Sequence, residues 1–180
     1  WRSERAYNAA VAYYLQMDYT LVLLGDIEEL WEERPGPVLN AYTRTTGLET
    51  RFHRQGRYYR IRGNHDDEWQ YPHRVAQLLG PRFRPPDLTV YESLLLTVVD
   101  GTPDPLGRIF MVHGHQGSTA SDRFAALSKT VVRYLWRPIQ RLTHWSLNTP
   151  ATSWQLRHRH NRMLYDWAEG QTGLILIAGH

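Results

Sequence analysis

Four short apolar runs in this chain each end directly in polar residues of the kinds that bind metal ions. The runs are rich in β-branched or aromatic residues and are too short for stable helices, so each predicts a buried strand. Open α/β sheets gather ligands and catalytic groups at the carboxyl ends of their strands, from segments distant in sequence. The sequence therefore predicts a sheet with one site assembled from four strand ends. The runs are residues 20–24, 58–62, 109–112 and 174–178.

The polar clusters after these runs contain Asp, Asn and His, which suit a borderline-hard divalent metal. Taken alone, Asp26 fits an Asx-turn or helix N-cap as well as it fits a metal ligand, and Asn64 beside His65 would favour a turn. Four such clusters in one structural context favour a metal site instead. The clusters are Gly25-Asp26, Gly63-Asn64-His65-Asp66, His113-Gly114-His115 and Gly179-His180.

The chain has 180 residues, of which 42% are hydrophobic, so a single domain over residues 1–180 can bury a core. Helices are expected over residues 4–16 and about 38–53. Residues 88–99 and 108–112 predict antiparallel strands in a second sheet, because a segment with Gly101 and two prolines separates them. Helices and strands alternate around this middle, so the fold class is α/β or α+β with layered sheets.

The positive charge of the chain is almost entirely arginine, since Lys129 is the only lysine. Arginine favours bidentate contacts with phosphate or carboxylate, although codon bias would give the same usage. A formal net charge of only +3 argues against a nucleic-acid partner. Cysteine is absent, and neither a membrane span nor a secretory signal is visible. We therefore expect a cytoplasmic location.

Residues 118–169 form a helical pattern dense in arginine and tryptophan. Arg133 and Arg137 recur at helical spacing and are candidates, together with His115, for contact with a substrate phosphate. This segment is interpreted either as a cap over the substrate or as a solvated helical subdomain.

The ordered set Gly25-Asp26-x-x-Glu29, Gly63-Asn64-His65-Asp66, His113-Gly114-His115 and Gly179-His180 resembles the calcineurin-like metallophosphoesterase superfamily. The resemblance covers residues 21–180. It implies an α/β fold in which two mixed sheets form a layered sandwich flanked by helices. It also implies a phosphoester hydrolase, either a phosphatase or a phosphodiesterase, with a dinuclear metal site and a metal-activated hydroxide.

The resemblance also assigns roles by position. Asp26 resembles the carboxylate that bridges both metals, and Asn64, His113 and His180 resemble the ligands of the second metal. His65 resembles the histidine that protonates the leaving oxygen, and it needs a carboxylate nearby to stay protonated. Glu29 matches the acidic position that orients this histidine in many relatives, and Asp66 is the alternative.

Two parts of the family pattern are missing from the sequence. No Asp-x-His precedes residue 21, and the chain stops after the first histidine of the closing Gly-His-x-His. Both segments serve the first metal. The domain is therefore expected to be incomplete at both termini, with two ions (Mn, Fe or Zn) in the intact protein and at most one, with little turnover, in this chain.

Two more specific alternatives stay open. The helical segment over residues 118–169 and the stretch from Gly25 to Trp31 are similar to UDP-2,3-diacylglucosamine pyrophosphohydrolases of the lipid A pathway, which often have Arg where His65 stands. The substrate would then be lipid-linked, with peripheral membrane contact, rather than a phosphorylated small molecule. A catalytically silent protein-binding scaffold would not need His65 beside Asn64. The sequence does not indicate an oligomeric state.

Overall fold

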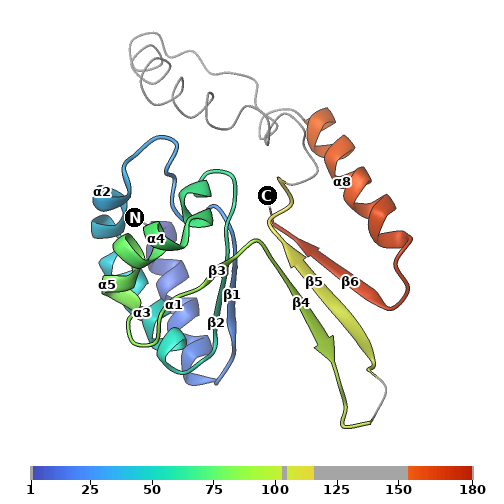
Figure 1. The fold of residues 1–180 in the computed structure, drawn as a ribbon, viewed down its shortest axis with the longest axis horizontal. Helices are drawn as coiled ribbons and strands as arrows, with labels where there is room; N and C mark the ends of the chain where they lie inside the picture. The colour runs from blue at the N-terminus through green and yellow to red at the C-terminus, as the bar shows by residue number, and fades with distance from the viewer. Residues whose placement is uncertain (1, 103–104, 116–153, 180) are drawn as a thin grey trace. The chain divides into compact units, whose positions relative to one another are not determined.

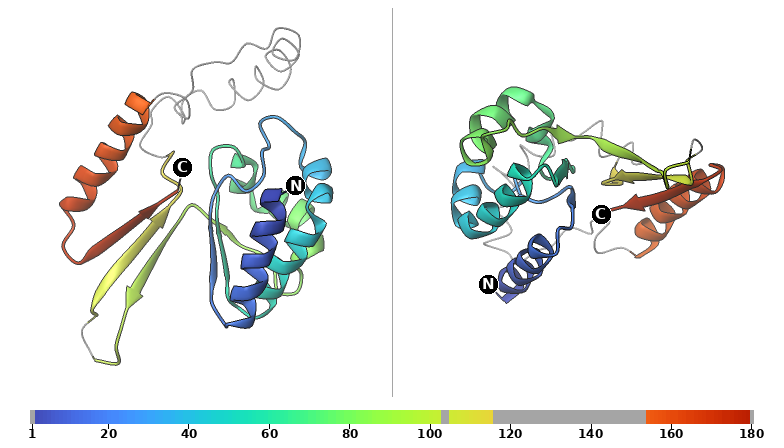
Figure 2. Two further views of the ribbon diagram at one scale, coloured as in Figure 1. Left: turned by 180° about the vertical axis from the view of Figure 1, so that it is seen from behind. Right: turned by 90° about the horizontal axis from the view of Figure 1, so that it is seen from below.

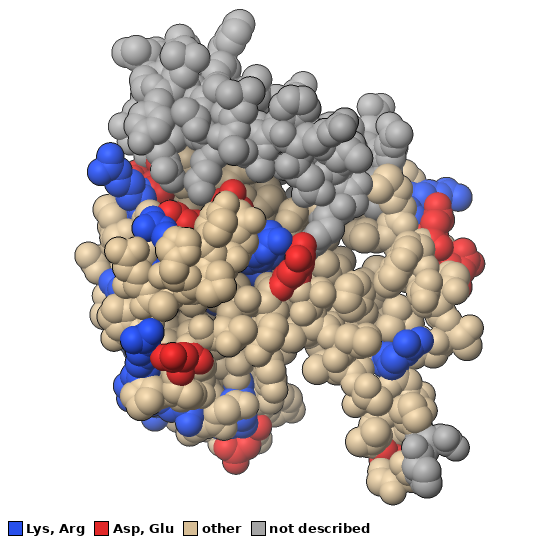
Figure 3. Space-filling model, in the orientation of Figure 1, with Lys and Arg blue, Asp and Glu red and all other residues tan. Residues whose placement is uncertain are grey.

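The computed structural model describes residues 2–102, 105–115 and 154–179. The chain divides into two compact units, Trp1–Glu92 (the first unit) and Ser93–His180 (the second unit). Figure 3 shows acidic and basic side chains interspersed on the visible face of the first unit. Within the described ranges, no helix has the length and apolar character that a bilayer span requires.

The first unit is built on a three-stranded sheet of β1 (Leu21–Leu24), β2 (Tyr58–Ile61) and β3 (Val90–Tyr91), in that order. All pairings are parallel, with Leu21 opposite Tyr58 and Arg60 opposite Val90. The expectation of a mixed sheet is therefore wrong here. Helical segments lie between consecutive strands, and such crossovers return the chain in the same direction.

The helices of the first unit lie on one face of this sheet (Figures 1 and 2). The helix expected over residues 38–53 is two helices, because the chain leaves helical geometry at Tyr42. Pro35 begins the first of the two, where its missing N–H costs nothing. The helices are α1 (Arg2–Gln16), α2 (Pro35–Ala41), α3 (Thr43–Arg54), α4 (Pro72–Arg74) and α5 (Gly80–Phe83).

A π-helical turn, Val75–Leu79, joins α4 to α5, and a 3₁₀ turn, Asp67–Gln70, precedes them. Val75 and Leu79 are buried in the π turn. Pro81 lies in the first turn of α5. Gly80-Pro81 therefore continues the helical segment rather than ending it, because proline is tolerated in a first turn.

The core of the first unit lies between the helices and the sheet. Val11 and Leu15 of α1 are buried there, whereas Tyr14, which precedes Leu15, is 47% exposed. The buried hydrophobic cluster consists of Val11, Leu15, Leu23, Leu30, Leu39, Phe52, Tyr58, Trp69, Val75, Leu79, Phe83 and Leu88. Leu23 of β1 and Tyr58 of β2 belong to this cluster, and polar loops follow both strands.

The second unit is a mixed sheet of β4 (Ser93–Val98), β5 (Gly107–Val112) and β6 (Leu174–Ala178), with β5 in the middle. The expected second sheet is confirmed, since β4 and β5 are antiparallel. β6 is parallel to β5, and helix α8 (Trp154–Glu169) precedes it. Trp167 of α8 packs against Phe110 of β5, with ring centroids 5.7 Å apart.

The strand expected over residues 88–99 is interrupted at Glu92, so that β3 and β4 belong to different sheets. Of the helical segment expected over residues 118–169, only α8 lies within the described part of the chain.

Candidate metal and phosphate site

The Asp26 loop (residues 25–31) begins with two residues in the left-handed region. Gly25 has φ 87° and Asp26 has φ 53°. Aspartate is one of the few residues with a side chain that visits this region readily. The turn leaves Asp26 exposed, and its Oδ1 accepts a hydrogen bond of 2.9 Å from the backbone N–H of His65. The end of β1 is thereby joined directly to the loop that follows β2.

Gly63 allows this close approach of the Asp26 loop to the Asn64 loop (residues 62–66). A Cβ atom at Gly63 would lie 2.0 Å from Oδ1 of Asp26 and 2.6 Å from its backbone nitrogen. Real Cβ atoms do not come so close to other heavy atoms, so only glycine fits. The Asp26 carboxylate therefore lies against the backbone that carries Asn64.

Asp66 holds the same two loops together from the inside. Its side chain is fully buried, one oxygen accepts from the N–H of Gly63 at 2.5 Å, and the other accepts from the N–H of Ile27 at 3.0 Å. Burial raises the pKa of Asp66, while Arg60 and the two backbone donors oppose the rise. Both carboxylate oxygens face the backbone, so Asp66 is not the partner of His65 in this structure.

A buried ionic cluster, which the sequence analysis missed, lies beneath the loops. Arg60 of β2 is fully buried, forms an ion pair with Glu28 and lies 3.9 Å from Asp66. Trp69 donates from Nε1 to the same Glu28 carboxylate at 2.9 Å. Burial alone would lower the pKa of Arg60, but the surrounding acidic groups raise it above its ordinary value. An arginine in the middle of a predicted buried strand was the pattern that could have revealed the cluster, since buried charges need partners.

His65 is held on two sides. Its Nδ1 lies 2.6 Å from Oε2 of Glu29. Trp31 stacks on the imidazole with ring centroids 4.7 Å apart and an interplanar angle of 7°. The hydrogen bond to Glu29 raises the pKa of His65, and desolvation opposes it. The contact occupies Nδ1, so Nε2 is the ring nitrogen left for another partner. No role of Trp31 is predicted from the sequence.

Asn64 carries the clearest sign of an unsatisfied ligand atom. Its Oδ1 is buried, and among the described residues no donor forms a hydrogen bond with it. Buried polar atoms are nearly always paired, so an orphaned amide oxygen calls for a specific partner. A hard or borderline divalent cation is such a partner, because it binds amide carbonyls. The residues of this edge therefore fit a metal ion.

In the second unit, β5 runs directly into His113 and His115, which are 2% and 5% exposed. Their ring centroids lie 5.4 Å apart. Gly114 between them has φ 103°, and a Cβ there would lie 2.9 Å from the carbonyl oxygen of Gly179. The N–H of Gly179 also donates to Val112 at 3.1 Å. The ends of β5 and β6 are thus side by side.

The structure brings the candidate residues together in two groups. Asp26, Glu29, Asn64, His65 and Asp66 belong to the first unit, and His113 and His115 to the second. Three other candidates, His180, Arg133 and Arg137, lie outside the described residues. Within the described ranges, no three His, Asp or Glu side chains gather closely enough to hold a metal ion. Asn64 carries an amide rather than one of these side chains, and His180 lies outside the described residues.

Comparison of the chain with protein-family models, with curated proteins and with solved structures found no match.

Proposed function

We propose that this chain belongs to a hydrolase that cleaves phosphoester bonds with the help of divalent metal ions. The observation that carries the proposal is the buried Oδ1 of Asn64, which has no donor in the described structure and lies on the loop that contacts Asp26. A metal ligand set explains both the orphaned oxygen and the glycine-dependent turn that holds the Asp26 carboxylate against the backbone of the Asn64 loop.

Asp26 and Asn64 would supply oxygen ligands, and His113 and His180 nitrogen ligands. Divalent ions held there would supply charge neutralisation for the phosphoryl oxygens and a lowered pKa for a water molecule, whose hydroxide form would be the nucleophile. Asp66 fixes the two loops relative to each other, because its carboxylate accepts hydrogen bonds from the backbone N–H groups of Ile27 and Gly63. The protein would hold these ligands in fixed positions. Ligands on a rigid scaffold need little reorganisation when charge develops in the transition state.

His65 would donate a proton to the leaving oxygen. Its pKa is raised by Glu29, so the imidazolium persists to higher pH than it would in water. Trp31 and Glu29 restrict the ring to one orientation. A proton donor held in place in this way contributes a factor of roughly 10²–10⁴ in rate, and most for a poor leaving group.

Binding and turnover test the proposal separately. Mn²⁺ should raise the melting temperature of the metal-depleted protein, and Asp26→Ala and Asn64→Ala should abolish most of that increase. Asn161→Ala on the exposed face of α8 is the matched control for the amide and should behave like wild type. A full Mn²⁺ response in both site variants would contradict the ligand assignment.

Turnover of two phosphodiesters, one with an aryl and one with an alkyl leaving group, is measured in parallel in the full-length protein. His65→Ala should keep the Mn²⁺ response and lose roughly 10²–10⁴ in kcat with an alkyl leaving group. His73→Ala, at an exposed histidine, serves as control. Unchanged turnover in the His65 variant would remove the proton-donor role. Activity on a UDP-sugar lipid but not on the aryl diester would select the lipid-linked pyrophosphatase, and metal binding without turnover of either would select the scaffold.

A further inference from the structure

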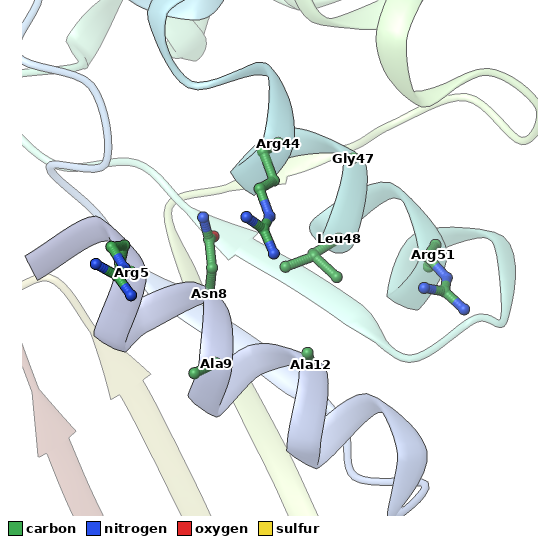
Figure 4. A pocket seen from close by; sticks show the side chains of 8 residues that line it. All are labelled: Arg5, Asn8, Ala9, Ala12, Arg44, Gly47, Leu48 and Arg51. Atoms are coloured by element: carbon green, nitrogen blue, oxygen red, sulfur yellow. The ribbon is translucent and has the colours of Figure 1, made fainter. Parts of the chain in front are cut away.

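A basic groove lies between α1 and α3 of the first unit, and none of the strand-end candidates lines it. Figure 4 shows its two walls, with Arg5 and Asn8 on α1 and Arg44 on α3. Its volume of about 440 Å³ is within the range of small-molecule sites. Of the described residues that line it, none is acidic.

The groove concentrates positive charge without compensation. In the described part of the chain, the side chains of Arg5, Arg44 and Arg51 form neither an ion pair nor a hydrogen bond. Arg5 and Arg44 also lie in the first turns of α1 and α3. A cation in that position opposes the positive end of the helix dipole, and a bound anion would reverse the sign of this interaction.

Asn8 is the second, independent indication of a ligand. It is only 5% exposed, and its Oδ1 accepts a hydrogen bond of 2.9 Å from the hydroxyl of Thr45. That bond fixes the amide so that its nitrogen is turned to the groove, between Arg5 and Arg44 (Figure 4). Among the described residues this nitrogen has no acceptor. An N–H group on the groove wall, flanked by two guanidinium groups, is suited to an oxyanion.

We propose that this groove binds the phosphate groups of a small oligophosphate ligand. The Asn8 amide would donate to one phosphate oxygen, while Arg5 and Arg44 would clamp the others and Arg51 would extend the charged wall along α3. The proposal does not depend on phosphoester hydrolysis, because it involves a different set of residues.

Calorimetric titration of the full chain with inorganic pyrophosphate and with ADP, without divalent metal, tests the proposal. Both should bind with a dissociation constant below about 1 mM, more weakly at high salt. Tighter binding of ADP would show that the groove also accepts a nucleoside, and equal binding would show that phosphates alone are recognised. Failure of both probes to bind would overturn the proposal.

Variants then locate the site. Arg44→Gln and Arg5→Gln should each weaken binding about tenfold or more, since each removes a charge-assisted hydrogen bond. Arg54→Gln is the matched control, because Arg54 is exposed on the same helix but does not line the groove. Equal weakening by the control would indicate non-specific charge attraction and overturn the site. Asn8→Asp keeps the acceptor for Thr45 and should abolish binding. If Asn8→Asp fails to fold, the two variants at the exposed Arg5 and Arg44 still test the site.

Discussion

Glu49 is a buried carboxyl group in the first unit and is 3% exposed. It accepts hydrogen bonds from the hydroxyls of Tyr7 and Tyr58, both at 3.2 Å. Burial raises its pKa above the usual value of about 4.5, although Arg60 opposes the rise. The folded protein therefore binds the Glu49 proton more tightly than the unfolded chain does.

This difference predicts how stability depends on pH. The stabilisation from the Glu49 proton is complete below the pKa of the unfolded chain and is lost as pH rises through the raised pKa of the folded state. Compared with Glu49→Gln, the wild type should lose unfolding free energy with rising pH, by at most about 1.4 kcal/mol per pH unit. Urea unfolding of both proteins at several pH values measures the slope.

An exposed carboxylate provides the control for this experiment. Glu169→Gln at the end of α8 should leave the pH profile of the wild type unchanged. Parallel profiles for wild type and Glu49→Gln would mean that Glu49 has the same pKa in the folded and unfolded states.

For single residues, identity and strand-end position could be predicted from the sequence, but side-chain contacts could not. Asp26, Asn64 and His65 could be selected because residue type and strand-end position were both visible in the sequence. That Glu29 rather than Asp66 contacts His65 depends on which way two neighbouring loops turn. The stacking of Trp31 and the burial of Arg60 depend on contacts between segments about thirty residues apart, which periodicity does not encode.

At the scale of elements, the strands were the most predictable part. β6 has the expected bounds, and β1 and β2 differ from expectation by one terminal residue. The breaks were not predictable, because Tyr42 and Glu92 are compatible with the elements that they interrupt. β3 and β4 belong to different sheets. Both are short and apolar, so the tertiary structure, and not the local sequence, decides which sheet each one joins.

The packing of the Asp26 loop on the Asn64 loop gives a prediction for glycine. Gly63→Ala places a methyl group where Asp26 lies, so it should cost about 1–3 kcal/mol of unfolding free energy and abolish the Mn²⁺ response. Gly36→Ala is the matched control in α2, where a Cβ meets nothing within 4 Å. It should leave metal binding intact and stabilise the protein by up to about 1 kcal/mol. Equal stability of the two variants would contradict the close approach.

At the scale of the whole molecule, the proposed metal ligands are divided between the two units. Asp26 and Asn64 come from the first unit and His113 from the second. His113→Ala should therefore reduce the Mn²⁺-induced increase in melting temperature as much as Asp26→Ala does, because binding to the native state is linked to stability. His158→Ala on the exposed face of α8 is the control.

A crystal structure with bound Mn²⁺ gives the geometric version of the same prediction. The three side chains should converge on one ion. Ligands of one ion bond at about 2.0–2.2 Å, so a separation beyond about 8 Å between any two of them would contradict the shared site.

The π-helical turn Val75–Leu79 has a consequence for insertions and deletions. A π turn contains one residue more than an α turn, so the length of the chain here exceeds what a regular helix would need. Loss of the exposed Ala76 or Gln77 would leave Val75 and Leu79 three positions apart, still on one helical face. Homologues of this protein should therefore vary in length by one residue at this turn while keeping both apolar positions, and a deletion inside α3 should not be found.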